Sequence, residues 1–80
     1  MTLTLLKRDY CSLCHAMFAA LQNWQQSYGF TIIQKEIDDF PQLVEQYDEL
    51  VPVLLDNNGD EICHWHLDEN ALLQYLDKSS

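Results

Sequence analysis

The residues best suited to chemistry are two cysteines separated by Ser12 and Leu13. Cys11 and Cys14 follow a short apolar segment and open a long amphipathic one, which places them between a strand and the start of a helix. At a helix start, unpaired backbone N–H groups and the positive end of the helix dipole stabilise a thiolate over a thiol. A second cysteine three residues on lies one turn away, close enough to form a disulfide. The pair therefore predicts thiol–disulfide chemistry.

The reacting species in such chemistry is a thiolate. A free cysteine has a pKa of about 8.5, and cysteines in this setting fall to roughly 3.5–7.5. Lys7 and Arg8 precede Cys11 and add positive charge, whereas Asp9 opposes them. We expect the amides of the first turn to dominate, because salt screens charges beyond about 8 Å. Cys14, inside the helix, is expected to keep its proton until it attacks.

Size and charge limit the classes of function. Eighty residues predict one domain spanning residues 1–80, and 48% hydrophobic residues suffice for a packed core. A formal charge of −9 argues against nucleic acid or an anionic membrane as a partner. The N-terminal apolar run is too short for a signal peptide, and no segment is long enough to span a membrane. We therefore expect a cytoplasmic monomer, in which cysteines stay reduced and are not a structural disulfide set.

Apolar periodicity predicts seven elements. An i, i+3, i+4 apolar stripe indicates a helix over residues 12–28, which Gly29 ends. Pro41 starts a second helix, and Asp68 caps the last one. The predicted strands are residues 3–7, 30–37, 51–55 and 61–65, with a hairpin turn at residues 56–60. The order β-α-β-α-β-β-α predicts an α/β fold with a mixed four-stranded sheet and helices on both faces.

This order, with Cys-x-x-Cys at the first strand–helix turn and a proline opening the third strand, resembles the thioredoxin fold. Within that fold the chain is similar to small bacterial glutaredoxin-like proteins, and residues 8–14 and 51–53 carry the likeness. The resemblance implies that Cys11 is the nucleophile and that Cys14 resolves the mixed disulfide. It therefore implies a protein-disulfide or dithiol oxidoreductase, an electron carrier in cell redox homeostasis.

The resemblance also implies residues that bind the substrate. A basic residue three before the nucleophile is common in glutaredoxins, and Arg8 matches it. Pro52 is expected to be cis, with the backbone of Val51 pairing with the bound thiol substrate. Tyr10 either flanks a substrate groove or packs against the protein, and both interpretations stay open.

Two departures from glutaredoxins bear on the partners. Ser12 and Leu13 replace the common Pro-Tyr pair, and Trp65 and His66 stand where glutaredoxins carry Gly-Gly. The large side chains argue against a glutathione site, so no tightly bound cofactor is expected. The predicted partners are a disulfide-containing protein or small thiol, and a reductase or glutathione as electron donor.

Other interpretations of the cysteines remain. Cys11 and Cys14 could have no chemical role and merely pack against neighbouring side chains. Alternatively, they could bind zinc or an iron–sulfur cluster in a non-catalytic binding module of the same fold. Cys63, His64 and His66 have the right types to join a zinc site, but strand alternation puts Cys63 on the face opposite to the histidines. We therefore predict no metal ligands and expect Cys63 in the core. Cys-x-x-Cys-His also matches haem attachment, which the predicted strands argue against.

Overall fold

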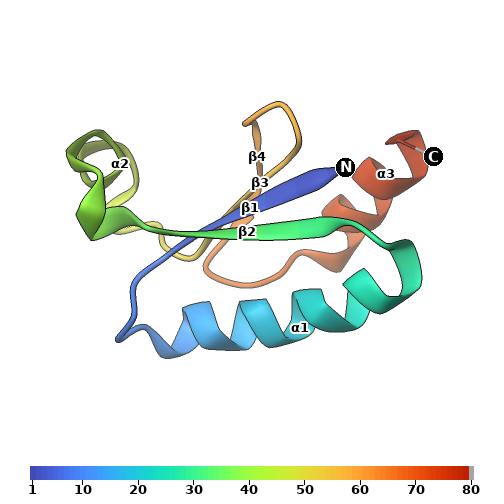
Figure 1. Cartoon of the computed structure of the whole chain (residues 1–80), viewed down its shortest axis with the longest axis horizontal. Coiled ribbons are helices and arrows are strands. Elements are labelled where there is room, and N and C mark those ends of the chain that lie inside the picture. The colour runs from blue at the N-terminus through green and yellow to red at the C-terminus, as the bar shows by residue number, and fades with distance from the viewer. Residues whose placement is uncertain (80) are drawn as a thin grey trace.

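A four-stranded mixed sheet organises the computed structural model, which describes residues 1–79 (Figure 1). The strand order is β2-β1-β3-β4, and the predicted α/β order β-α-β-α-β-β-α is confirmed. The strands are β1 (Thr2–Lys7), β2 (Thr31–Glu36), β3 (Val53–Leu55) and β4 (Glu61–His64). The helices are α1 (Ser12–Tyr28), α2 (Pro41–Tyr47) and α3 (Glu69–Ser79), with a short 3-10 helix η1 (Ile37–Asp39).

Strand pairing brings two loops to one end of the sheet. β1 pairs with β2 in parallel, so the chain must cross over between them, and α1 makes that connection. β3 runs antiparallel to β1, with Leu6 opposite Val53. The residue before β3 therefore lies level with Lys7, where β1 ends. The loop that follows β1 and the loop that precedes β3 meet at this end.

Each face of the sheet has its own apolar core. Because side chains alternate along a strand, Leu5 and Leu6 of β1 point to opposite faces. Helices α1 and α3 cover one face, on which the buried residues are Leu3, Leu5, Met17, Leu21, Phe30, Leu54, Cys63, Leu72 and Leu76. The segment from η1 through α2 covers the other, around the buried residues Leu6, Ile37 and Val53. The predicted placement of helices on both faces is confirmed.

Helix α1 begins and ends where its sequence predicts. Cys11 is the N-cap in extended conformation, and Gly29 ends the helix in the left-handed region at φ 74°. The Gly29 N–H donates to the Gln25 carbonyl at 2.7 Å, which satisfies one of the last helical carbonyls. Since only glycine adopts this φ freely, its position fixes the length of α1 and the direction of the chain into β2.

All four strands differ slightly from the predictions. β1 begins one residue earlier than predicted, at Thr2, and β2 is one residue shorter than predicted at each end. The predicted strand 51–55 begins at Val53, because proline has no N–H to donate to the ladder. The predicted strand 61–65 ends at His64, because Trp65 has φ 65° and turns the chain out of the sheet. The start of β3 and the end of β4 lie at the end of the sheet where the two loops meet.

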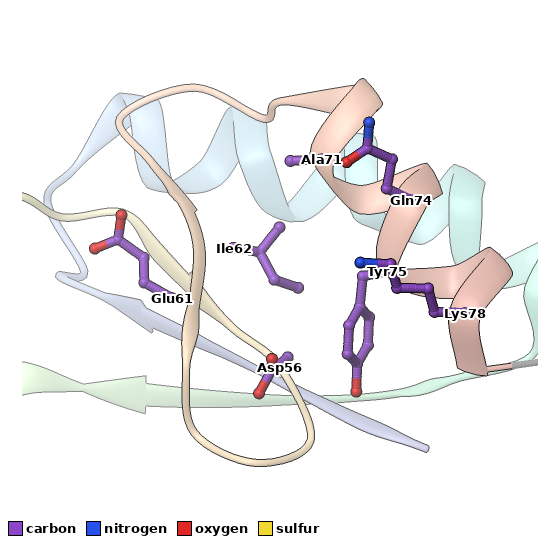
Figure 2. A pocket seen from close by; sticks show the side chains of 7 residues that line it. All are labelled: Asp56, Glu61, Ile62, Ala71, Gln74, Tyr75 and Lys78. Atoms are coloured by element: carbon purple, nitrogen blue, oxygen red, sulfur yellow. The ribbon is translucent and has the colours of Figure 1, made fainter.

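The β3–β4 hairpin packs against α3 at the other end of the sheet (Figure 2). Asp56 holds the turn, accepting hydrogen bonds from the N–H groups of Asn58 and Asp60 at 2.8 and 3.0 Å. Tyr75 of α3 points at the hairpin and accepts a hydrogen bond from the Asn57 N–H at 3.1 Å. A shallow pocket lies between hairpin and helix, lined by Asp56, Glu61, Ile62, Ala71, Gln74, Tyr75 and Lys78.

Within residues 1–79, every helix is too short or too polar to cross a bilayer.

Candidate functional site

The sulfur of Cys11 lies against the first turn of α1. The Cys11 N–H donates to the Arg8 carbonyl at 3.2 Å, which closes the turn between β1 and α1. The Cys14 N–H then donates to Sγ of Cys11 at 3.1 Å. This amide is one of the donors that a helix start leaves without an intrahelical partner. Such a donor stabilises negative charge on the sulfur that accepts from it.

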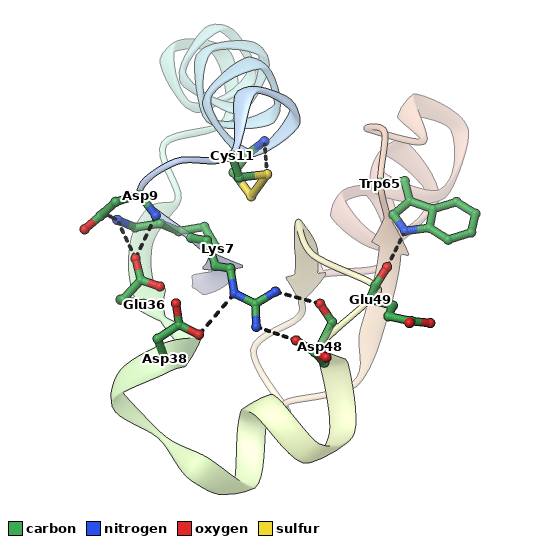
Figure 3. Close-up of a disulfide and its surroundings, with 10 residues drawn as sticks. Lys7, Asp9, Cys11, Glu36, Asp38, Asp48, Glu49 and Trp65 are labelled. Carbon is green, nitrogen blue, oxygen red and sulfur yellow. Dashed lines mark hydrogen bonds and ion pairs between the residues drawn. A yellow bond between two sulfur atoms is a disulfide. The ribbon is translucent and has the colours of Figure 1, made fainter.

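Cys11 and Cys14 are joined in a disulfide, with their Cα atoms 5.2 Å apart (Figure 3). That separation is ordinary for a disulfide, so one helical turn accommodates the bond. The two sulfurs differ in access: Cys11 is half-buried, whereas Cys14 is only 1% exposed. An incoming molecule therefore meets Cys11 first.

The loop before β3 lies at the same end of the sheet as the disulfide loop. Its Val51–Pro52 bond is cis, as the resemblance implied. Pro52 is buried and Val51 is half-buried. The Pro52 carbonyl accepts a hydrogen bond from the Trp65 N–H at 2.8 Å, which ties this loop to the end of β4.

Lys7, one of the two cations ahead of Cys11, contacts carboxylates. Its ammonium forms an ion pair with Asp9 and lies 3.8 Å from Glu36. The hydrogen bond to Asp9 raises the pKa of Lys7, and the same bond lowers the pKa of Asp9. Glu36 also accepts a hydrogen bond from the Asp9 N–H at 2.8 Å. The positive charge of Lys7 is thus largely neutralised by its neighbours.

Arg8 is held in the same way. Its Nε lies 3.1 Å from an Asp38 carboxylate oxygen, and Nη1 donates to the Asp48 carbonyl at 2.8 Å. Nη2 donates to the Asp48 carboxylate, and the pKa of Arg8 is raised, first by this bond and then by the bond to Asp38. The guanidinium therefore braces the end of β1 against η1 and the end of α2.

Apolar side chains next to the disulfide are open to solvent. Tyr10, directly before Cys11, is 79% exposed, and Leu13, between the two cysteines, is 40% exposed. Tyr10 thus lies away from the core. It leaves contact area beside the more accessible sulfur.

A family model described as a glutaredoxin-like domain matches residues 2–77 of this chain. The chain belongs to this family. No curated protein sequence matches it significantly.

Solved structures share the fold of this chain. An NMR structure of a Nitrosomonas europaea protein is 33% identical, with a TM-score of 0.86 over 92% of this chain and 88% of that one. An X-ray structure of a protein from X. campestris is also 33% identical, with a TM-score of 0.69, covering 98% and 99% of the two chains. Thioredoxin 1 from Thermosipho africanus, 23% identical with a TM-score of 0.67 over 99% and 98%, shares the fold. The predicted thioredoxin-like fold is confirmed.

The third cysteine of this glutaredoxin-like domain is not part of the dithiol. Cys63 is a free, buried residue of the core under α1 and α3, as expected, and burial raises the pKa of its thiol. His64 instead faces Glu61, with Nδ1 2.8 Å from a carboxylate oxygen. Among residues 1–79, no three His, Cys, Asp or Glu side chains are grouped as metal ligands would be.

Trp65 is the residue of the site region that sequence reasoning placed wrongly. As a strand residue it would share a face with Cys63; instead it follows the strand, is 48% exposed, and its indole Nε1 donates to the Glu49 carbonyl at 2.9 Å. Together with its backbone bond to Pro52, this holds both ends of the loop that contains Val51. The signal in the sequence was the large residue standing where glutaredoxins have glycine.

Proposed function

We propose that this protein is a dithiol–disulfide oxidoreductase in which Cys11 is the nucleophile and Cys14 the resolving cysteine. The single observation that carries the proposal is the amide of Cys14 directed at Sγ of Cys11. The burial of Cys14 supports the division of roles, because a disulfide in solution meets Cys11 first. Arg8, Tyr10, Val51 and Pro52 are the proposed substrate-binding residues.

The proposed cycle balances without a cofactor. In the reduced protein, the Cys11 thiolate attacks one sulfur of a substrate disulfide, forms a mixed disulfide and expels the other sulfur as a thiolate, which takes a proton from water. Cys14 then loses its proton, and its thiolate attacks Sγ of Cys11. This step forms the intramolecular disulfide and releases the second substrate thiol. Two electrons pass from the dithiol to the substrate, and an external reductase or thiol in the cytoplasm must return them.

Cysteine variants test this division of roles. Cys11→Ser is expected to abolish reduction of hydroxyethyl disulfide, because the attacking thiolate is gone. Cys14→Ser is expected to accumulate a mixed disulfide, detectable by mass spectrometry. Cys63→Ala serves as the matched control and should retain activity. If Cys11→Ser keeps the activity, Cys11 is not the nucleophile.

Alkylation against pH tests the activation. In the reduced protein, the rate at which Cys11 reacts with iodoacetamide should rise with a midpoint well below about pH 8.5, the midpoint of a free thiol. A curve coincident with that of a free thiol would contradict amide stabilisation.

The redox couple separates this function from a non-catalytic module. A reversible disulfide with a potential between roughly −180 and −300 mV fits an oxidoreductase. A disulfide that cannot be cycled, or stoichiometric zinc in the purified protein, would instead indicate the binding module.

A further inference from the structure

The surface around the disulfide is acidic, and its cations are occupied. Figure 3 shows the disulfide above carboxylates from several segments: Asp9, Glu36, Asp38, Asp48 and Glu49. Against these five, the nearby cations are Lys7 and Arg8, and each contacts two of the carboxylates. Among residues 1–79, the other cations are Lys35, which lies over the Phe40 ring, and Lys78, which lines the hairpin pocket.

A second feature that could bind an anion is also occupied by the chain itself. The N-terminus of α3 follows Trp65 in the chain, and a helix start leaves amides without intrahelical partners that can bind an anion. Asp68 caps it, accepting a hydrogen bond from the Ala71 N–H at 3.0 Å. A carboxylate from solution would have to displace the Asp68 carboxylate and would be repelled by it.

Exposed apolar side chains border the same site. Tyr10 and Leu13 lie beside the more accessible sulfur, and Trp65 lies beyond the loop of Val51. Aromatic side chains of this kind contribute much of the binding energy in protein interfaces. Apolar contact area surrounded by negative charge fits a polypeptide that carries cations around an accessible disulfide.

We propose that the dithiol face selects disulfides within cationic polypeptide segments and disfavours glutathione disulfide. The inference rests on the proposed dithiol–disulfide exchange and names its substrate class. Glutathione offers more carboxylates than ammonium groups, and both Lys7 and Arg8 at the described dithiol face already contact carboxylates of the chain. A lysine- or arginine-rich segment would meet the carboxylate of Glu49 and would pack on Tyr10. It would also meet the carboxylate of Asp9, which contacts Lys7 but stays 80% exposed.

Two matched peptides test the proposal. Each carries one cysteine as a mixed disulfide with 2-thiopyridine, and they differ only in flanking lysines or flanking glutamates. Stopped-flow absorbance measures the rate at which the reduced protein releases pyridine-2-thione from each peptide. This rate is divided by the rate of the same peptide with dithiothreitol, which corrects for differences in intrinsic reactivity between the peptides. The lysine probe should react at least about tenfold faster at about 10 mM salt, and the ratio should approach one at about 1 M salt.

Charge variants localise the effect. Asp9→Asn/Glu49→Gln should lower the lysine-to-glutamate rate ratio by about threefold or more. Asp60→Asn/Glu69→Gln is the matched control, because it removes the same charge from exposed positions in the hairpin turn and on α3. A ratio that both double variants change equally would mean that net charge, not this face, sets the preference.

The outcomes separate the substrate class from the reaction. The proposed selection would be overturned if the two peptides had equal normalised rates at low salt. It would also be overturned if the glutamate peptide or glutathione disulfide reacted faster than the lysine peptide. Failure to reduce any probe, including neutral hydroxyethyl disulfide, would instead overturn the dithiol–disulfide exchange itself.

Discussion

Three cysteines in one small protein have three different environments. Cys11 accepts an amide hydrogen bond at the surface, Cys14 is buried behind it, and Cys63 lies in the core under two helices. The same functional group is thus expected to be reactive, latent and inert respectively. The position of each cysteine relative to the start of α1 and to the apolar core determines its expected reactivity.

Burial of Cys63 predicts a pH dependence of stability. Its pKa is raised in the folded protein, first by desolvation, from an ordinary value of 9.0. The protonated thiol is favoured in the core. The contribution of Cys63 to the stability of the folded protein is therefore fully present below pH 9 and is lost as the pH rises through the folded pKa. The free energy of unfolding in urea should therefore fall above pH 9 less steeply in Cys63→Ala than in the natural chain. Equal slopes would contradict the assigned cause.

At the level of elements, the sequence predicted regular structure well and the site loops less well. Helix α1 repeats its apolar stripe over several turns between a capping residue and Gly29, so both ends could be predicted. The start of β3 and the end of β4 were predicted less well. Pro52 has no N–H to donate to the sheet, and Trp65 leaves the strand while its N–H bonds to the Pro52 carbonyl. The cysteine pair was visible in the sequence, but the carboxylates that hold Arg8 come from η1 and from the residue after α2, far away in the chain.

The end of α1 gives a test of that helix alone. Gly29→Ala should lower the free energy of unfolding by about 1–2 kcal/mol, because a Cβ is disfavoured at φ 74°. No heavy atom lies within 4 Å of that Cβ, so the cost is conformational and not steric. Gly29→Asn is the control and should cost less, since asparagine tolerates the left-handed region. Urea denaturation measures both, and equal losses would point to another cause.

The whole molecule depends on two thin apolar layers, one on each face of its sheet. In the larger layer, Leu21 of α1 is completely buried between α1 and the strands. A chain of 80 residues has a stability of only about 4–12 kcal/mol, so a single cavity in that layer is a large fraction of the total.

Leu21→Ala should therefore destabilise the protein by about 2–5 kcal/mol. Leu13→Ala, on the same helix but exposed to solvent, is the matched control for stability and should change it by about 0.5 kcal/mol or less. Thermal unfolding of both variants in the oxidised form measures the difference. Similar losses would show that the buried layer does not carry the stability of α1.

The bridge that Trp65 makes to the Glu49 carbonyl also has a practical consequence. The chain has two tryptophans, and the other, Trp24, stacks on Tyr28 near the far end of α1. The indole of Trp65, beside the loop that contains Val51, is an intrinsic fluorophore whose emission follows the polarity around it. Replacing Trp24 with phenylalanine would leave a single built-in reporter, with which docking of a partner could be followed without any attached dye.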